Sequence, residues 1–182
     1  VTINLEQCDL TGDFLNSTTN IRAYQWGTVG GMGKLHDLVI GEMPMPDPEK
    51  PLPKGTELRH NGDDLKGAKN LGVFMTGSTV TGRISSATQA YRDGLNLITA
   101  DNRDELSNVT QTPAAPVNNG VVVTLDDASK WYVTGTSYLT SLTLAERAVL
   151  AGAEGKKLTM KVNGVDTPVA PGTYTGVIEL SV

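Results

Sequence analysis

The chain ends with Pro171-Gly172-Thr173-Tyr174-Thr175-Gly176-Val177-Ile178-Glu179-Leu180-Ser181-Val182. A Pro-Gly turn opens this run, and apolar residues or glycines then alternate with mostly polar ones, which is typical of a half-buried strand. Chain ends usually fray unless a sheet holds them, so we expect this strand to be paired and buried on one side. The face expected to be buried carries Tyr174, Gly176, Ile178, Leu180 and Val182.

Two alternating runs occupy the start of the chain. Their parity changes near Glu6-Gln7, which predicts a bulge or a break at that point. The pattern alone does not decide which run faces a core. The first run consists of Val1, Ile3 and Leu5, and the second of Cys8, Leu10, Gly12 and Phe14.

Short β-branched or alternating runs separated by turn residues recur through the rest of the chain. About eight strands in one domain predict an all-β sandwich. No internal repeat is evident. The expected strands cover 21–26, 35–40, 71–75, 79–84, 91–99, 121–125, 131–134 and 158–162.

One short helix is expected beside these strands. Thr143 and Glu146 have the spacing of a capping box, good helix formers cover 144–153, and Gly155 is a typical C-terminal stop. The Pro-rich segment 43–53 fits neither helix nor sheet. It is interpreted as an extended connector, with a docking segment for a partner as the alternative.

Composition narrows the function classes. The chain has 182 residues, 38% hydrophobic and 19% charged, with a net charge of −5 and one cysteine. An acidic chain without Lys/Arg clusters gives no support for nucleic-acid binding. One cysteine excludes an intramolecular disulfide, and no apolar run approaches the ~20 residues of a membrane helix. A first residue other than Met is consistent with a processed, exported form.

No catalytic, metal or cofactor site is predicted. The Gly-rich run 27–35 has the wrong spacing for a phosphate loop. His36 and His60 stand far apart without carboxylates at ligand spacing. Asp63-Asp64 and Asp126-Asp127 could pair as acids or calcium ligands, but solvated turn residues explain both pairs.

Two parts of the chain resemble chaperone–usher fimbrial subunits, both the K-eighty-eight type adhesin subunits and the colonisation-factor pilins. The terminal strand resembles the last strand of these pilins. Thr11-Gly12-Asp13-Phe14, followed by Trp26-Gly27 and by a Gly-rich turn that ends at Asp37-Leu38, resembles the start of the K-eighty-eight type. The resemblance covers residues 10–40 and 170–182.

The resemblance implies an immunoglobulin-like sandwich that lacks one strand. Residues 1–15 would then form a donor-strand extension, and 16–182 the pilin domain. The donor would fill a groove in the next subunit by β-augmentation. The run Cys8, Leu10, Gly12 and Phe14 matches the donor pattern, with Gly12 as its small position, and Val1, Ile3 and Leu5 form an alternative or additional donor run. Tyr174, Gly176, Ile178, Leu180 and Val182 would line that groove.

The expected function is therefore a non-enzymatic structural or adhesive subunit of a bacterial surface fimbria, exported through the periplasm and assembled head-to-tail. The resemblance implies identical or related subunits, a periplasmic chaperone, an outer-membrane usher and a host glycan receptor as partners. Trp131, Tyr132 and Tyr138 are candidates to stack on a sugar, and burial in the core is the alternative for these aromatics.

Two other function classes compete with this hypothesis. A phage tail or capsid decoration protein would share the β-sandwich but would need no missing strand. An enzyme of carbohydrate metabolism has no supporting constellation of residues in this sequence.

Overall fold

The structure of the chain is a computed structural model that describes residues 1–18, 70–91, 108–117 and 119–182. Contacts divide the chain into two units: unit 1 contains 1–18, 67–88 and 111–182, and unit 2 contains 19–66 and 89–110. Several sequence predictions fall outside the described residues. These are the strands at 21–26 and 35–40, most of 91–99, the Pro-rich segment 43–53, both histidines and Asp63-Asp64.

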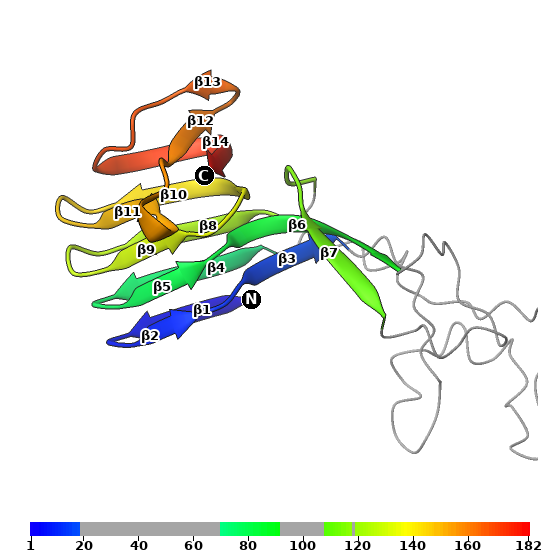
Figure 1. Cartoon of the computed structure of the whole chain (residues 1–182), viewed down its shortest axis with the longest axis horizontal. Helices are drawn as coiled ribbons and strands as arrows, with labels where there is room; N and C mark the ends of the chain where they lie inside the picture. Colours follow the sequence, from blue (N-terminus) through cyan, green and yellow to red (C-terminus); the bar gives the residue numbers. More distant parts are fainter. Residues whose placement is uncertain (19–69, 92–107, 118) are drawn as a thin grey trace, which may run out of the picture. The chain divides into compact units, whose positions relative to one another are not determined.

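Strands dominate the described part of the chain, which confirms the all-β prediction (Figure 1). The strands are β1 (Thr2–Glu6), β2 (Asp9–Thr11), β3 (Phe14–Thr18), β4 (Leu71–Thr76), β5 (Thr79–Gly82), β6 (Ile84–Tyr91), β7 (Val109–Pro113), β8 (Val121–Leu125), β9 (Lys130–Val133), β10 (Ser137–Leu144), β11 (Val149–Gly152), β12 (Thr159–Val162), β13 (Val165–Asp166) and β14 (Gly172–Ser181).

The strands form three sheets, and the chain moves from one sheet to the next as it advances. Sheet A has the order β1-β4-β8-β10-β14-β12-β13, sheet B the order β11-β9-β5-β2, and sheet C the order β3-β6-β7. The path β1 to β2 to β3 is repeated as β4 to β5 to β6, and these passes pair in parallel. We call the first pass rung 1 and the second rung 2. Strands β8 and β9 form rung 3, and the end of β10 with β11 forms rung 4.

In the core, the strand register places apolar residues of one rung beside apolar residues of the next. Because successive side chains of a strand point to opposite faces, each apolar residue lies directly above the apolar residue of the previous rung. Sheets A and B both contribute to one buried cluster. The columns that face this cluster are Ile3-Val73-Val123-Leu142, Leu5-Met75-Leu125-Leu144 and Leu10-Val80-Trp131-Leu150.

The C-terminal strands close one end of sheet A. Strand β14 pairs antiparallel with β10, β12 pairs antiparallel with β14, and β13 follows as a two-residue edge strand. We call β12, β13 and β14 the C-terminal cap. In Figure 1 the cap lies at the top of sheet A, and β1 and β2 lie at the opposite end of the stack.

The connectivity differs from the immunoglobulin-like prediction. That fold pairs its strands antiparallel. Here the four rungs pair in parallel, and the C-terminal cap pairs antiparallel. The expected absence of an internal repeat was also wrong. Leu10-Thr11-Gly12-Asp13-Phe14 lies beside Val80-Thr81-Gly82-Arg83-Ile84, with three of its positions paired in register. Residues 19–69 separate the two copies in the sequence and conceal this similarity.

The helix predicted over 144–153 was wrong. Leu144 ends β10 and is 5% exposed, because it completes a column over Leu125. A turn follows, closed by the bond from Ala148 N–H to the Ala145 carbonyl, and the chain then enters β11. Only a short 3₁₀ turn, Ala153–Gly155, interrupts the strands there. The helix-capping pattern of Thr143 and Glu146 is overridden by the pairing of β10 with β8, which is distant in sequence.

The predicted break at Glu6-Gln7 is confirmed. Gln7 has a φ of 49°, and its N–H donates to the Thr76 carbonyl at 2.9 Å. The chain turns a corner here from sheet A into sheet B. The two sequence runs therefore line two walls of one core instead of alternating in a single strand.

Candidate functional site

Strand β14 does not border an empty groove along its core-facing half. It pairs with β10 on one side and, over Thr159–Val162, with β12 on the other. Ile178 and Leu180 are fully buried, as predicted. Tyr174 is half-buried, and Gly176 and Val182 are exposed.

The five residues thus do not share one buried face, and a break in register explains why. The β10–β14 register shifts between Leu139 and Ser141. Opposite this shift, Gly176 has a φ of 112°, which favours glycine. A Cβ on Gly176 would also lie 2.3 Å from Asn163 Oδ1. Asn163 Oδ1 accepts from the Val177 N–H, so its side chain extends the pairing beyond β12.

The predicted donor segment is paired within its own chain. Strands β1, β2 and β3 pair with β4, β5 and β6, so residues 1–15 belong to unit 1 and not to a separate extension. Their other sides carry no strand within the part of the chain that the structure describes. We call the outer sides of β1 and β2, together with Phe14 at the start of β3, the rung 1 edge.

Apolar side chains are partly exposed to solvent at the rung 1 edge. Leu10 is 38% exposed, although its register partner Val80 is fully buried. Phe14 is half-buried, although its partner Ile84 is fully buried. Of the predicted donor residues, Leu5 is buried, Ile3, Cys8 and Phe14 are half-buried, and Val1, Leu10 and Gly12 are exposed.

Along β1, alternate backbone groups have no strand partner among the residues that the structure describes. Gly72 N–H donates to the Val1 carbonyl, and Gln7 N–H donates to the Thr76 carbonyl, both at 2.9 Å. Since a parallel ladder uses alternate residues of each strand, the polar groups of Thr2, Asn4 and Glu6 point away from β4. Such a row is a template for a further strand.

Charged and polar side chains tie rung 1 to rung 2. Arg83 donates from Nε to Asp13 Oδ2 at 3.0 Å and from its backbone N–H to Asp13 Oδ1 at 2.7 Å. Side-chain hydrogen bonding from Arg83 holds the pKa of Asp13 below its usual value. At the preceding corner, between sheets A and B, Cys8 N–H donates to Ser78 Oγ at 3.2 Å.

Asp126 organises the same corner and is a structural residue. It accepts from Ser129 Oγ at 2.6 Å and from the Gly77 N–H at 3.1 Å, and these bonds, Ser129 first, lower its pKa. Asp127 instead accepts from the Arg147 N–H at 3.0 Å. The two carboxylates therefore serve separate turns. Within the described ranges, no three His, Cys, Asp or Glu side chains gather where they could hold a metal ion.

The three candidate aromatics have different surroundings. Trp131 is fully buried, and its Nε1–H donates to the Gly82 carbonyl at 2.9 Å. The burial alternative therefore holds for Trp131, because a core column passes through it. Tyr132 and Tyr138 are half-buried. The Tyr138 N–H donates to Ser85 Oγ at 2.8 Å, which fixes that part of β10 against β6.

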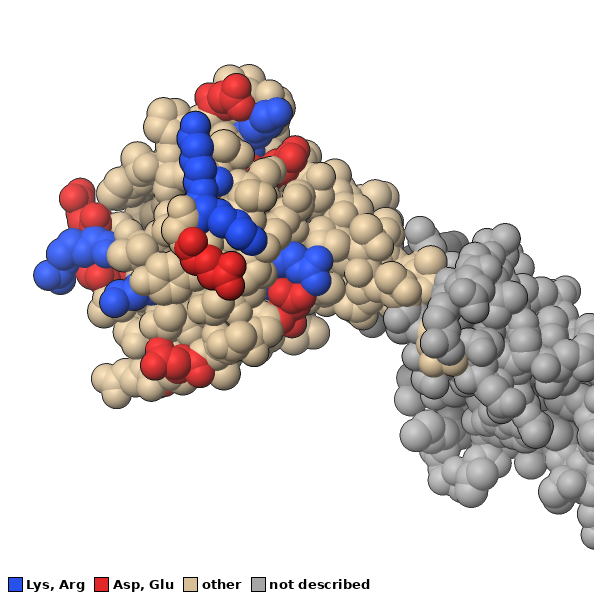
Figure 2. Space-filling view, viewed as in Figure 1, with Lys and Arg blue, Asp and Glu red and all other residues tan. Residues whose placement is uncertain are grey.

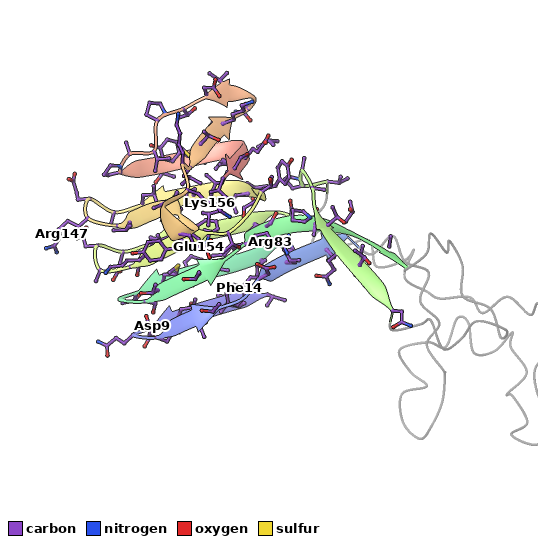
Figure 3. All side chains as sticks on the ribbon, viewed as in Figure 1. Asp9, Phe14, Arg83, Arg147, Glu154 and Lys156 are labelled. Atoms are coloured by element: carbon purple, nitrogen blue, oxygen red, sulfur yellow. The ribbon has the colours of Figure 1, made fainter. Side chains whose placement is uncertain are left out.

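Tyr132 lines a hollow of about 390 Å³ that opens to solvent. We call it the Tyr132 hollow. Its floor comes from sheet B and its wall from the turn after β11 (Figure 3). Sequence reasoning found Tyr132 but missed the wall, because that turn was predicted to be helical. The lining residues are Thr81, Tyr132, Thr134, Ala153, Glu154 and Lys156.

Comparisons with protein-family models, curated proteins and solved structures return no match. No helix in the described residues has the length and hydropathy to cross a membrane. Three features of unit 1 bear on function: the rung 1 edge, the C-terminal cap and the Tyr132 hollow.

Proposed function

We propose that this chain is a non-enzymatic structural and adhesive module at the end of a bacterial surface fibre of the fimbrial type, displayed outside the cell. Its rung 1 edge is continued by a further rung of the same pattern, from a neighbouring subunit or an adjoining segment. Its C-terminal cap forms the end of the stack. The observation that carries the proposal is the rung 1 edge.

The chemistry of the rung 1 edge favours addition of strands. Free N–H and C=O groups along β1 accept an added strand by β-augmentation. Leu10 and Phe14 lie partly exposed above fully buried partners. Full burial of a large apolar side chain contributes ~1.5–3 kcal/mol. A further rung would therefore gain backbone bonds and apolar burial together.

Donor-strand exchange through residues 1–15 stays a prediction, as do the chaperone and the usher. Release of β1, β2 and β3 would expose Val73, Val80 and Ile84, which are fully buried beneath them. We therefore propose that the same segment forms the joint through its free edge. Residues 1–15 thus still form the joint in this proposal, but by adding a strand to their outer side and not by inserting into another subunit.

Sedimentation velocity over a range of concentrations tests the joint. We expect the chain to self-associate, because two rung 1 edges cover each other when no other strand is supplied. Asn4→Pro removes an outward N–H from β1, and Leu10→Lys places a charge among the exposed apolar groups. Both variants should remain monomeric at concentrations where the unchanged chain associates.

Phe74→Lys is the matched control for this experiment. The exposed fraction of Phe74, 40%, is similar to the 38% of Leu10. Phe74 lies on β4 within sheet A, however, and not at the edge. Association should survive this change. A chain that stays monomeric throughout, or edge variants that associate like the unchanged chain, would refute the proposed joint.

Immunogold labelling of the native assembly tests the location. Labels at the ends of fibres on the bacterial surface are expected. Labels on virions would favour the phage-protein alternative, and labels confined to the cell interior would exclude both functions.

A further inference from the structure

We infer that the Tyr132 hollow binds a neutral saccharide. The inference specifies a ligand class and a site for the adhesive part of the proposed function, and it rests on that function. It is carried by the residues that line the hollow, by the strand pairing and hydrogen bonds that hold its floor and wall, and by the backbone conformation of Glu154.

The aromatic ring of Tyr132 contributes to the floor of the hollow. Tyr132 lies on β9, which pairs with β5 on one side and β11 on the other. Its neighbours Trp131 and Val133 are fully buried and anchor the strand. A phenol ring offers an apolar face and a polar tip, which matches a sugar ring with its C–H face and hydroxyl rim. Thr81, the register partner of Tyr132, adds a hydroxyl group beside the ring.

The wall is held close to the sheet. Lys156 N–H donates to the Ala153 carbonyl at 3.0 Å, which closes the turn. A Cβ on Gly152 would lie 2.3 Å from the Lys156 carbonyl oxygen, so the returning backbone packs directly against β11. The hollow is thus formed before a ligand arrives, and binding would require little ordering.

The polar groups of the wall favour a neutral ligand. Glu154 and Lys156 are both exposed, and neither forms an ion pair within the described part of the chain. A phosphate would meet the carboxylate, and a metal ion or amine would meet the ammonium group. Sugar hydroxyls both donate and accept, so they can use both groups as well as Thr134. Figure 2 shows acidic and basic side chains interspersed on this face, without a field of one sign.

The backbone conformation of Glu154 is consistent with a role of its side chain at the hollow. Glu154 has a φ of 54°, a left-handed conformation that disfavours residues with a Cβ. Its side chain is exposed, so burial does not account for a glutamate there. Unfavourable backbone conformations cluster at binding and active sites. Glu154 lines the hollow, and its carboxylate is the feature that a glycine here would lose.

An oligosaccharide array tests the inference. The full chain is applied to immobilised neutral, sialylated and sulfated oligosaccharides, and the best-retained neutral compound is then titrated by calorimetry. We expect retention on neutral compounds and at least a tenfold loss of affinity in Glu154→Gln and in Tyr132→Ala. Tyr138→Ala is the matched control, because Tyr138 is also a half-buried aromatic but does not line the hollow.

Glu154→Gly separates binding from folding. Glycine adopts a positive φ readily, so the melting temperature should rise or stay unchanged while saccharide affinity falls. A fall in both quantities would indicate a structural role and overturn the inference. Retention only on sialylated or sulfated compounds, no retention at all, or neutral binding unchanged in Glu154→Gln and Tyr132→Ala would also overturn it.

Self-association is measured on the same samples to keep the two proposals apart. If the chain associates through the rung 1 edge but binds no neutral saccharide, the inference fails and the proposed joint stands. If saccharide binding is found without association, the proposed joint fails instead.

Discussion

Asp13 and Arg83 lie 70 residues apart in the sequence and form a clip between consecutive rungs. The guanidinium of Arg83 bonds to Asp13 Oδ2 through two nitrogens, while the Arg83 backbone N–H bonds to Asp13 Oδ1. Both residues follow a Thr-Gly pair at equivalent corners of rungs 1 and 2. The Asp13 side chain thus binds both the backbone N–H and the guanidinium group of Arg83 at the corresponding corner of rung 2.

We expect Asp13→Asn to lower the free energy of unfolding by about 1 kcal/mol at pH 7, because the side chains are roughly one-third exposed and solvent screens the pair. The pKa of Asp13 is lowered in the folded state. Its contribution is therefore present above the unfolded value near 3.9 and is lost as pH falls through the lower folded pKa. Urea unfolding at pH 7 and below pH 3 measures the difference.

A weak ion pair supplies the control for that prediction. Arg147 Nη2 and Asp127 Oδ2 are 3.8 Å apart, and their side chains are 81% and 46% exposed. Arg147→Gln removes this charge pair and keeps the backbone bond of Arg147, so its effect should be close to zero. An equal pH dependence in Asp13→Asn and the unchanged chain would contradict the assigned role of the clip.

Gly82→Ala should be strongly destabilising. A Cβ at this position would lie 1.8 Å from the Gly12 carbonyl oxygen, so the backbones of rungs 1 and 2 would have to move apart. We expect a loss of about 2–3 kcal/mol in thermal or urea unfolding. In the control Gly135→Ala, the new Cβ would lie 3.2 Å from the Arg83 Cδ, a side-chain atom that has to shift by only a few tenths of an ångström, and the loss should be under about 1 kcal/mol.

Trp131→Phe should cost about 1–3 kcal/mol, because the Gly82 carbonyl then loses its buried donor. Trp131→Ala should cost about 3–5 kcal/mol through the cavity it leaves. Tyr132→Phe, one residue along the same strand, should leave the unfolding midpoint nearly unchanged. Equal effects of Trp131→Phe and Tyr132→Phe would show that the bond to Gly82 adds no stability.

Asn119→Leu should cost about 2–3 kcal/mol. Asn119 is 5% exposed, donates from Nδ2 to the carbonyls of Asn16 and Ala87, and accepts from the Val117 N–H. Leucine fits the volume but leaves these backbone groups without their partner. Hydrogen exchange at the Val117 amide should rise in the variant, whereas an unchanged rate would contradict this role.

Much of the strand content could be predicted from the sequence, but not its pairing. The runs at 71–75, 79–84 and 121–125 predict strands, and burial within each of these strands follows a period of two. It does not identify the neighbour. The parallel partner of Ile3 is Val73, and that pairing depends on how the chain returns after a long separation.

The candidate site was predictable only in part. Tyr132 was singled out as an aromatic, and Trp131 beside it was equally plausible until the core column decided between them. Glu154 and Lys156 were hidden because Thr143 and Glu146 resemble a helix cap. Leu142 and Leu144 override that local signal, since the buried columns of sheet A hold them.

The C-terminal cap gives the molecule a direction. Sheet A adds three strands beyond β10, whereas sheet B stops at β11, so the two ends of the stack have different outlines. A further rung can lie flush against β1 but not against the two-residue strand β13. Under the proposed function, each fibre accommodates one such chain, at the end that the rung 1 edge can join. The supply of this chain relative to the repeating component would then set how many fibres form and how long they grow.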